Sequence, residues 1–206
     1  MNISDLIKTR RAIRRYQDRP IPREQIEQLL DLAHWAPSAH NRQPWRFAVL
    51  TQHADRARLA RAMGERLRED RTADGDPPDE IERDVARSYA RITGAPVVIV
   101  ACLSMVDMDT YPDRRRNRNE WIMAVQGVSM AVQNMWLAAH SQGLAMCWLC
   151  APLFAPNVVR ETLNLPPDWE PLGLMTLGCP AEEKTRTRKP LAESVIWLYK
   201  EVGNRE

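Results

Sequence analysis

The chain has 206 residues, of which 44% are hydrophobic, and its formal net charge at pH 7 is +2. This length suits one domain with its own core, and so small a charge gives no indication of nucleic acid binding. The N-terminus lacks the apolar segment of a secretory signal, and the apolar run at 95–106 is too short to span a bilayer. We therefore expect a single domain over residues 1–206 of a cytoplasmic protein that binds neither membranes nor nucleic acid.

The first predicted helix covers residues 5–9 and leads into a strongly cationic segment. Four arginines fall within residues 10–15, in a chain where arginine greatly outnumbers lysine. A solvated basic face is the usual explanation of such a cluster. The alternative is an anion site, because guanidinium groups form bidentate contacts with phosphate. Ile13 and Tyr16 interrupt the charges and can anchor the segment to a core, which favours a structured anion site.

A second predicted helix, over residues 22–35, delivers the chain to a polar loop at 36–47. Apolar residues at 26, 29, 30 and 33 have the spacing of an amphipathic helix, and Pro22 suits its first position. The loop carries the polar side chains of Ser38, His40, Asn41 and Gln43 between two prolines. A loop this dense in donors and acceptors indicates either a binding site or a turn with internal hydrogen bonds.

The remaining segments alternate between helical and extended patterns. A strand is predicted around residues 47–49, and two charged helices follow, separated by a proline-rich stretch at 72–80. We expect these helices to form an insertion or lid at about 54–92. Residues 95–103 lack alternation, which predicts a strand buried on both faces. The later predictions are a polar loop at 111–118, a broadly apolar helix at 120–142 ending at Gly143, a strand at 145–150, a helix at 155–163, and strands at 171–177 and 195–199.

Several functional motifs are absent from the sequence. Neither the dinucleotide-binding glycine pattern nor the P-loop pattern occurs, and no serine, histidine and acid arrangement stands out. Cys147 and Cys150 have the spacing of a redox or metal site, but zinc would need a second pair of ligands. We expect reduced thiols, two mostly buried apolar cysteines at this pair and no metal.

Four segments, taken in order, resemble the nitroreductase family of flavin enzymes. They are Arg10-Arg11-Ala12-Ile13-Arg14, the polar loop from Pro37 to Trp45, the stretch from Gly143 to Cys150, and Leu177-Gly178-Cys179-Pro180 followed by Arg186 and Arg188. The resemblance implies an α+β fold in which helices surround a central mixed, mainly antiparallel sheet. It also implies an intertwined homodimer, FMN at the dimer interface, and NADH or NADPH as reductant.

Matched by position, the resemblance also implies which residues hold FMN. They are Arg10, Arg11, Ala12, Arg14, Pro37, Ser38, Ala39, Asn41, Leu149, Cys150, Arg186 and Arg188. Arg10 and Arg188 are expected nearest the phosphate and Arg14 toward the ring, whereas the polar loop reaches the flavin of the opposite subunit. Leu149 and Cys150 are expected near flavin N5. Ala12 stands where the family usually has serine, so one side-chain hydrogen bond, worth about 1 kcal/mol, is expected to be missing.

The implied activity is ping-pong hydride transfer from NAD(P)H through flavin N5 to a nitroaromatic, a quinone or a similar planar acceptor. No catalytic side chain is required, because the flavin carries the redox chemistry. His40 is the one candidate for a proton donor, and its alternative role is simple hydrogen bonding in the loop.

Two alternatives remain open at this point. One alternative comes from a second resemblance, to the domain that reduces a dehydro precursor of the 8-hydroxy-5-deazaflavin coenzyme with FMN. This resemblance is carried by residues 154–160 and 165–173 and by Tyr111-Pro112-Asp113. A non-catalytic protein that binds flavin or deazaflavin is the other alternative.

Overall fold

The structure is a computed structural model of the chain, and it describes residues 2–198. Four strands form one sheet in the order β1-β2-β4-β3, and every neighbouring pair is antiparallel. The strands are β1 (Trp45–Leu50), β2 (Val97–Leu103), β3 (Ala145–Leu149) and β4 (Glu170–Gly178). The helices are α1 (Ile3–Thr9), α2 (Arg23–His34), α3 (His53–Ala73), α4 (Pro78–Thr93), α5 (Arg114–Ser141) and α6 (Pro156–Leu163), with short 3-10 turns η1 (Ala39–Asn41), η2 (Ala151–Phe154) and η3 (Leu191–Glu193).

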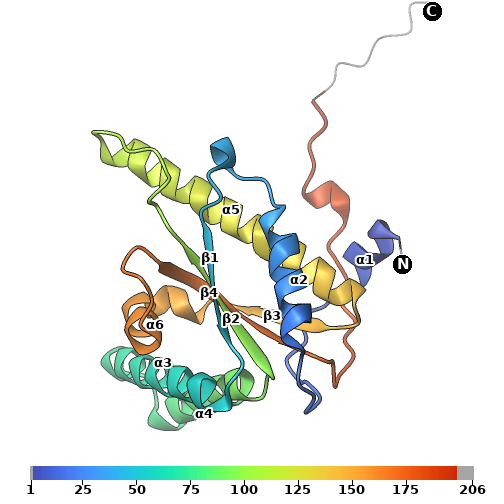
Figure 1. The fold of residues 1–206 in the computed structure, drawn as a ribbon. Helices are drawn as coiled ribbons and strands as arrows, with labels where there is room; N and C mark the ends of the chain where they lie inside the picture. Colours follow the sequence, from blue (N-terminus) through green and yellow to red (C-terminus); the bar gives the residue numbers. More distant parts are fainter. Residues whose placement is uncertain (1, 199–206) are drawn as a thin grey trace, which may run out of the picture.

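Helices cover both faces of the sheet, so the fold has three layers (Figure 1). Val97, Ile99 and Ala101 of β2 pack in one apolar cluster with α2 and α5. Their neighbours Val98 and Val100 pack on the opposite face with α3, α4 and α6. All seven residues of β2 are buried. The expectation of a strand buried on both faces is therefore confirmed, and the fold is α+β as expected.

The long helix α5 begins earlier than predicted. The sequence indicated a polar loop at 111–118 and a helix from 120, but α5 starts at Arg114. Asp113 caps the helix, because its carboxylate accepts a hydrogen bond from the backbone N–H of Arg116 at 2.9 Å. The prediction missed this cap because the arginines of the first turn gave no apolar periodicity.

The predicted C-terminal strand at 195–199 is also wrong for the residues that the structure describes. Residues 195–198 follow η3 without strand pairing, and Tyr199 lies outside the described residues. Ile196, Trp197 and Leu198 are strongly exposed. The apolar composition that suggested a strand is therefore real, but these side chains have no covering partner in the described part of this chain.

The other predicted elements are confirmed to within a few residues. Asn2 caps α1, because its side chain accepts the N–H of Asp5. Gly143 follows α5 with a φ of 75°, as expected of a residue that ends a helix. Among the described residues, no helix combines the length and the apolarity needed to cross a bilayer.

Candidate functional site

Arginines from two distant segments meet beside the C-terminal half of α5. The Arg10 guanidinium carbon lies 4.1 Å from the ring centroid of Trp136, and the side chain is partly buried. Burial lowers the pKa of Arg10, and the neighbouring charges of Arg188 and Arg11 lower it further. None of these three arginines forms an ion pair with a carboxylate of residues 2–198. Convergent cations without a counter-charge are typical of an anion site.

Arg11 gives a second indication of an absent partner. Its Nη1 donates to the carbonyl oxygens of Lys8 and Arg10 at 2.6 and 2.8 Å, and its Nη2 lies 3.5 Å from the carbonyl oxygen of Arg186. Its Nε is buried and has no hydrogen-bond partner within the described chain. A buried donor without an acceptor costs free energy, so this group is suited to a ligand oxygen.

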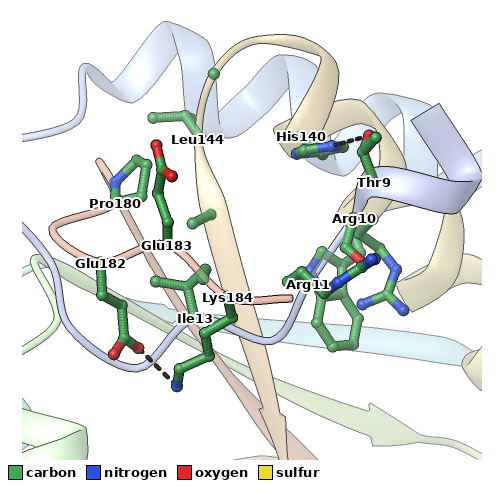
Figure 2. Close-up of a pocket in the computed structure, with 13 residues that line it drawn as sticks. Thr9, Arg10, Arg11, Ile13, His140, Leu144, Pro180, Glu182, Glu183 and Lys184 are labelled. Carbon is green, nitrogen blue, oxygen red and sulfur yellow. Dashed lines mark hydrogen bonds and ion pairs between the residues drawn. The ribbon is translucent and has the colours of Figure 1, made fainter. Parts of the chain in front are cut away.

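Arg10 and Arg11, but not Arg188, border a cavity of about 390 Å³ between α1, the end of α5, β3 and the segment that follows Pro180 (Figure 2). Its lining residues are Thr9, Arg10, Arg11, Ile13, Trp136, His140, Gly143, Leu144, Ala145, Pro180, Glu182, Glu183 and Lys184. Figure 2 shows Glu182 and Lys184 paired at one side of the cavity, at 2.8 Å. The opposite side is cationic, so the two sides of the cavity differ in charge.

The cationic segment is held along β3 by backbone hydrogen bonds. The N–H of Ile13 donates to the carbonyl of Met146 at 3.2 Å, and Ala12 forms a parallel bridge with the same residue. The Tyr16 hydroxyl donates to the Ile13 carbonyl at 2.6 Å. Ile13 is buried and Tyr16 is half-buried. These contacts confirm the expectation that Ile13 and Tyr16 anchor the segment. They also fix the position of the backbone that carries the arginines.

Arg14 lies at the other end of this segment, away from Arg10. Its N–H donates to the Glu182 carboxylate at 2.8 Å, and its side chain lies beside the Cys147 thiol. Burial raises the pKa of Cys147, and the charges of Arg14, Arg91 and Lys184 oppose that increase. Arg10 and Arg14 therefore occupy opposite ends of one segment, and Arg14 is not among the residues that line the cavity.

The polar loop has an unusual backbone. His40, Asn41 and Gln43 have φ values of 50°, 54° and 50°, a region that residues other than glycine seldom adopt. Ser38 stabilises the turn, because its hydroxyl oxygen accepts the N–H of Gln43 at 3.0 Å and its carbonyl accepts the N–H of Asn41 at 3.0 Å. The internal hydrogen bonds of an ordinary turn are thus present. The backbone strain is typical of functional loops, so the binding interpretation also stands.

Within one chain, the polar loop and the arginine cluster lie far apart. The loop packs on α5 at Gly127, where an added Cβ would lie 3.4 Å from the Cβ of Ser38. Arg10 contacts the same helix at Trp136, nine residues further on. At about 1.5 Å per residue, these two contact points are separated by about 14 Å along the helix axis. The structure therefore does not join the two predicted halves of the flavin site in a single copy.

The expectation for Cys147 and Cys150 is only half correct. Cys147 is buried, but Cys150 is exposed just beyond β3. The Trp148 indole N–H donates to the Cys150 sulfur at 2.8 Å. No group of metal-ligating side chains occurs among the described residues. The thiol at the strand end is accessible, whereas Leu149 beside it packs against the α3 and α6 side of the core.

Sequence reasoning missed two residues of the cavity wall, Trp136 and His140. They are four positions apart on α5 and so share a helix face, a spacing that could have identified them. The ring nitrogen Nε2 of His140 lies 2.9 Å from the Thr9 hydroxyl, which itself donates to the Asp5 carbonyl. Burial lowers the pKa of His140, and the charges of Arg10 and Arg11 lower it further.

An antiparallel sheet covered on both faces, with an unneutralised arginine cluster beside it, defines an α+β protein with a candidate anion site. The sequence profile of the nitroreductase family matches residues 7–179, and this chain belongs to that family. A candidate NADH dehydrogenase/NAD(P)H nitroreductase of Methanothermobacter thermautotrophicus is 33% identical over 184 residues, covering 88% of this chain and 79% of the relative.

Two further proteins match a similar or larger share of the chain. The 5,6-dimethylbenzimidazole synthase of Rhodospirillum rubrum is 30% identical over 186 residues, covering 86% of this chain and 82% of that protein. The crystal structure of a candidate nitroreductase in complex with FMN, from Desulfovibrio desulfuricans, superposes with a TM-score of 0.73. That chain is 26% identical, and the match covers 96% of this chain and 97% of the other. The nitroreductase-like fold inferred from the sequence is therefore confirmed.

Proposed function

We propose that this protein is an FMN-dependent oxidoreductase that takes hydride from NADH or NADPH and passes it to a planar acceptor such as a nitroaromatic or a quinone. The observation that carries the proposal is the cluster of Arg10, Arg11 and Arg188, which no carboxylate of the described chain neutralises. The relatives support it, since a solved structure with this fold contains FMN. A phosphate dianion supplies the counter-charge that the cluster lacks.

The residues present fit this cofactor in charge and in donor chemistry. Arg10 and Arg188 would hold the phosphate, and the buried Nε of Arg11 would gain an acceptor. Arg14, at the far end of the segment, would place positive charge near the ring, where the reduced flavin is negative. When bound, FMN supplies the hydride transfer itself. The protein's contribution is therefore binding, orientation and electrostatic stabilisation, with His40 as the candidate proton donor.

A homodimer would complete the site. The polar loop carries the remaining predicted FMN contacts, Pro37, Ser38, Ala39 and Asn41, but lies about 14 Å along α5 from the Arg10 contact. A second copy can supply that loop to the arginines of the first. Exposed apolar side chains offer an interface, among them Trp35, Trp197 and Leu198, which are 79, 75 and 95% exposed. Apolar exposure of this extent is typical of a surface that a partner covers.

One experiment tests both binding and turnover. The purified protein is incubated with FMN, desalted, and examined for flavin absorption bands at about 370 and 450 nm. Under anaerobic conditions, NADH or NADPH is expected to bleach these bands, and nitrofurazone is expected to restore them. A protein that stays colourless after incubation with FMN contradicts the proposal. Bound flavin that neither nicotinamide bleaches supports the non-catalytic alternative instead.

A second candidate function is the FMN-dependent reduction of a dehydro precursor of the 8-hydroxy-5-deazaflavin coenzyme. The segments at 154–160 and 165–173, which resemble that enzyme, are joined in the structure, because the N–H of Leu165 donates to the carbonyl of Arg160 at 2.9 Å. The Trp121 indole N–H donates to the Glu170 carboxylate at 3.0 Å, and the Ser104 hydroxyl donates to Asp168 at 2.6 Å. These contacts connect residues 165–173 to α5 and to the loop that precedes it. Comparing turnover of the dehydro precursor with turnover of nitrofurazone separates the two functions.

A further inference from the structure

The first two turns of α5 carry an excess of positive charge without partners. Arg114, Arg115 and Arg118 are exposed, and their side chains form no ion pair or hydrogen bond with residues 2–198. The charged hairpin of α3 and α4 is different, because most of its arginines are paired. Its ion pairs include Arg66 with Asp70 and Arg68 with Glu82, at 2.7 and 2.6 Å.

The three unpaired arginines lie on one side of the helix. At about 100° per residue, Arg114, Arg115 and Arg118 fall within an arc of about 100°. Arg116 points elsewhere, because it is paired with Asp113 at 2.5 Å and lies 4.7 Å from the Tyr111 ring centroid. The side chain of Asn117 accepts the N–H of Tyr111 and donates to its carbonyl, both at 2.8 Å. The start of α5 is therefore firmly held, and only one of the four arginines at 114–118 is neutralised.

This cationic face lies at the same end of the molecule as the polar loop. Figure 1 shows the start of α5 and the η1 turn at the upper end of the sheet. Arg42, which follows η1, pairs with Asp109 at 2.7 Å, so the polar loop is tied to the segment that leads into α5. A surface that receives the polar loop therefore lies at the same end of the molecule as the arginine face, about 14 Å along α5 from Arg118.

The position of these arginines at the start of α5 also argues against their being only a solvated surface. Cations in the first turn are disfavoured by the helix dipole, so the unpaired Arg114 and Arg115 oppose helix stability. An anionic ligand removes this disadvantage, because it neutralises the charges that the helix itself disfavours. Simple solubility would be met equally well by carboxylates at these positions, which the dipole favours.

We propose that Arg114, Arg115 and Arg118 bind the anionic part of the acceptor, a planar molecule that carries several carboxylate or phosphate groups. This inference rests on the proposed function. The polar loop would border the flavin of a second copy, so the arginine face would lie at the mouth of the same cleft. The planar group would reach the flavin, and the charged part would extend along α5. Uncharged acceptors would react without using these residues.

Steady-state kinetics with two acceptors test this assignment. One acceptor is a neutral nitroaromatic, and the other is the same nitroaromatic joined to a tri-aspartate peptide. The variant is Arg114→Gln/Arg115→Gln/Arg118→Gln, and the control is Arg19→Gln/Arg61→Gln/Arg83→Gln, which lowers the net charge equally on other exposed surfaces. We expect the variant to raise KM for the charged acceptor about tenfold or more, with unchanged turnover of the neutral one. Equal effects on both acceptors, or an equal effect of the control, would overturn the inference.

Calorimetry without turnover keeps the two proposals separable. Tri-aspartate and inorganic tripolyphosphate are titrated into FMN-treated protein, which distinguishes a carboxylate ligand from a phosphate ligand. We expect binding that the triple variant loses and the control retains. If the unmodified protein fails to reduce the neutral acceptor, the proposed function fails, but the titration still decides the role of the arginines. The proposed role of the arginines is rejected if either small anion binds the triple variant as tightly as the unmodified protein. It is also rejected if a DNA duplex binds more tightly than either small anion.

Discussion

The Arg10 guanidinium stacks on the Trp136 ring with its carbon 4.1 Å from the ring centroid. An aromatic face attracts the cation without occupying its N–H groups. The guanidinium is thus fixed in place while its donors stay available to a ligand, which a carboxylate partner would not allow. The contact also joins the segment after α1 to the C-terminal half of α5, so two distant parts of the sequence define one wall of the cavity.

Replacing Arg10 is expected to weaken FMN binding through the phosphate. Arg10→Gln removes a charge-assisted contact worth about 1.5–3 kcal/mol, which corresponds to a factor of about 10–100 in the dissociation constant. Flavin fluorescence quenching measures the affinity. Riboflavin, which lacks the phosphate, is expected to bind the variant and the unmodified protein equally. Arg15→Gln is the matched control, because Arg15 is exposed in the same segment. A loss of equal size with riboflavin contradicts phosphate binding by Arg10.

The pKa of His140 is expected to change when an anion binds in the cavity. Burial and the nearby Arg10 and Arg11 lower its pKa, so the ring is neutral at pH 7. In the protein without ligand, stability is therefore lost as pH falls below about 6.5, where the unfolded histidine takes a proton before the folded one does. FMN should raise the pKa of His140 by offsetting the arginine charges. Imidazole NMR shifts followed against pH measure it, and riboflavin should leave the pKa unchanged. No change on adding FMN places the phosphate elsewhere.

The fold was largely predictable because its elements carry strong local signals. The continuous apolar run of β2 predicts a buried strand, and the amphipathic spacing of α2 predicts a helix. Gly143 marks the end of α5. The start of α5 was missed, since its first turn depends on the Asp113 cap rather than on apolar periodicity. The C-terminal strand was overpredicted, because an apolar composition does not specify a pairing partner.

The candidate site was predictable only in part. The charge of Arg188 acts on Arg10, although 178 positions separate them in the sequence, and their shared role at a phosphate stays a prediction. Trp136 and His140 were not recognised, because their contribution depends on which helix face α1 covers, a tertiary relationship without a local signal. The polar loop was recognised, but its distance from the arginines along α5 became apparent only from the fold.

The cysteines are expected to differ sharply in reactivity. Cys150 is exposed and should react with a maleimide in the folded protein. Cys102 is fully buried, and burial raises its pKa to about 12, so it should react only after unfolding. If Cys150 borders the flavin ring, FMN should slow its labelling several-fold and leave the half-buried Cys179 unaffected. Peptide mapping by mass spectrometry measures each rate. Equal labelling of Cys150 with and without FMN would place the flavin away from it.

The hairpin of α3 and α4 remains a predicted lid, and Arg71 provides a test. Its guanidinium pairs with Asp76 and Asp84, both at 2.5 Å, and so closes the turn between the two helices. Arg71→Met should increase proteolytic cleavage at residues 74–77 several-fold. Arg23→Met, which removes the exposed pair with Glu27 on α2, should not. FMN should protect the hairpin if it closes over the cofactor. Unchanged cleavage of the unmodified protein when FMN is added rules out the lid.

Gly173 should prove intolerant of any side chain, because Trp148 lies directly over it. An added Cβ would stand 2.7 Å from Cζ2 of Trp148 and 2.8 Å from its Cε2, closer than van der Waals contact allows. Gly173→Ala should therefore cost about 1–3 kcal/mol of unfolding free energy, measured by urea denaturation. The displaced indole would also lose its hydrogen bond to the Cys150 sulfur, so the thiol should label at a changed rate.

Two further variants separate this clash from a general effect of removing glycine. Gly75→Ala, at a φ of 81° with no atom within 4 Å of the added Cβ, should cost only about 1–2 kcal/mol through backbone strain. In a Trp148→Ala background the clash is absent, and Gly173→Ala should then be nearly neutral. Substitutions of two residues in contact are expected to have coupled effects on the free energy of unfolding. If the costs of the substitutions at 148 and 173 instead simply add, Trp148 is not the residue that requires glycine at position 173.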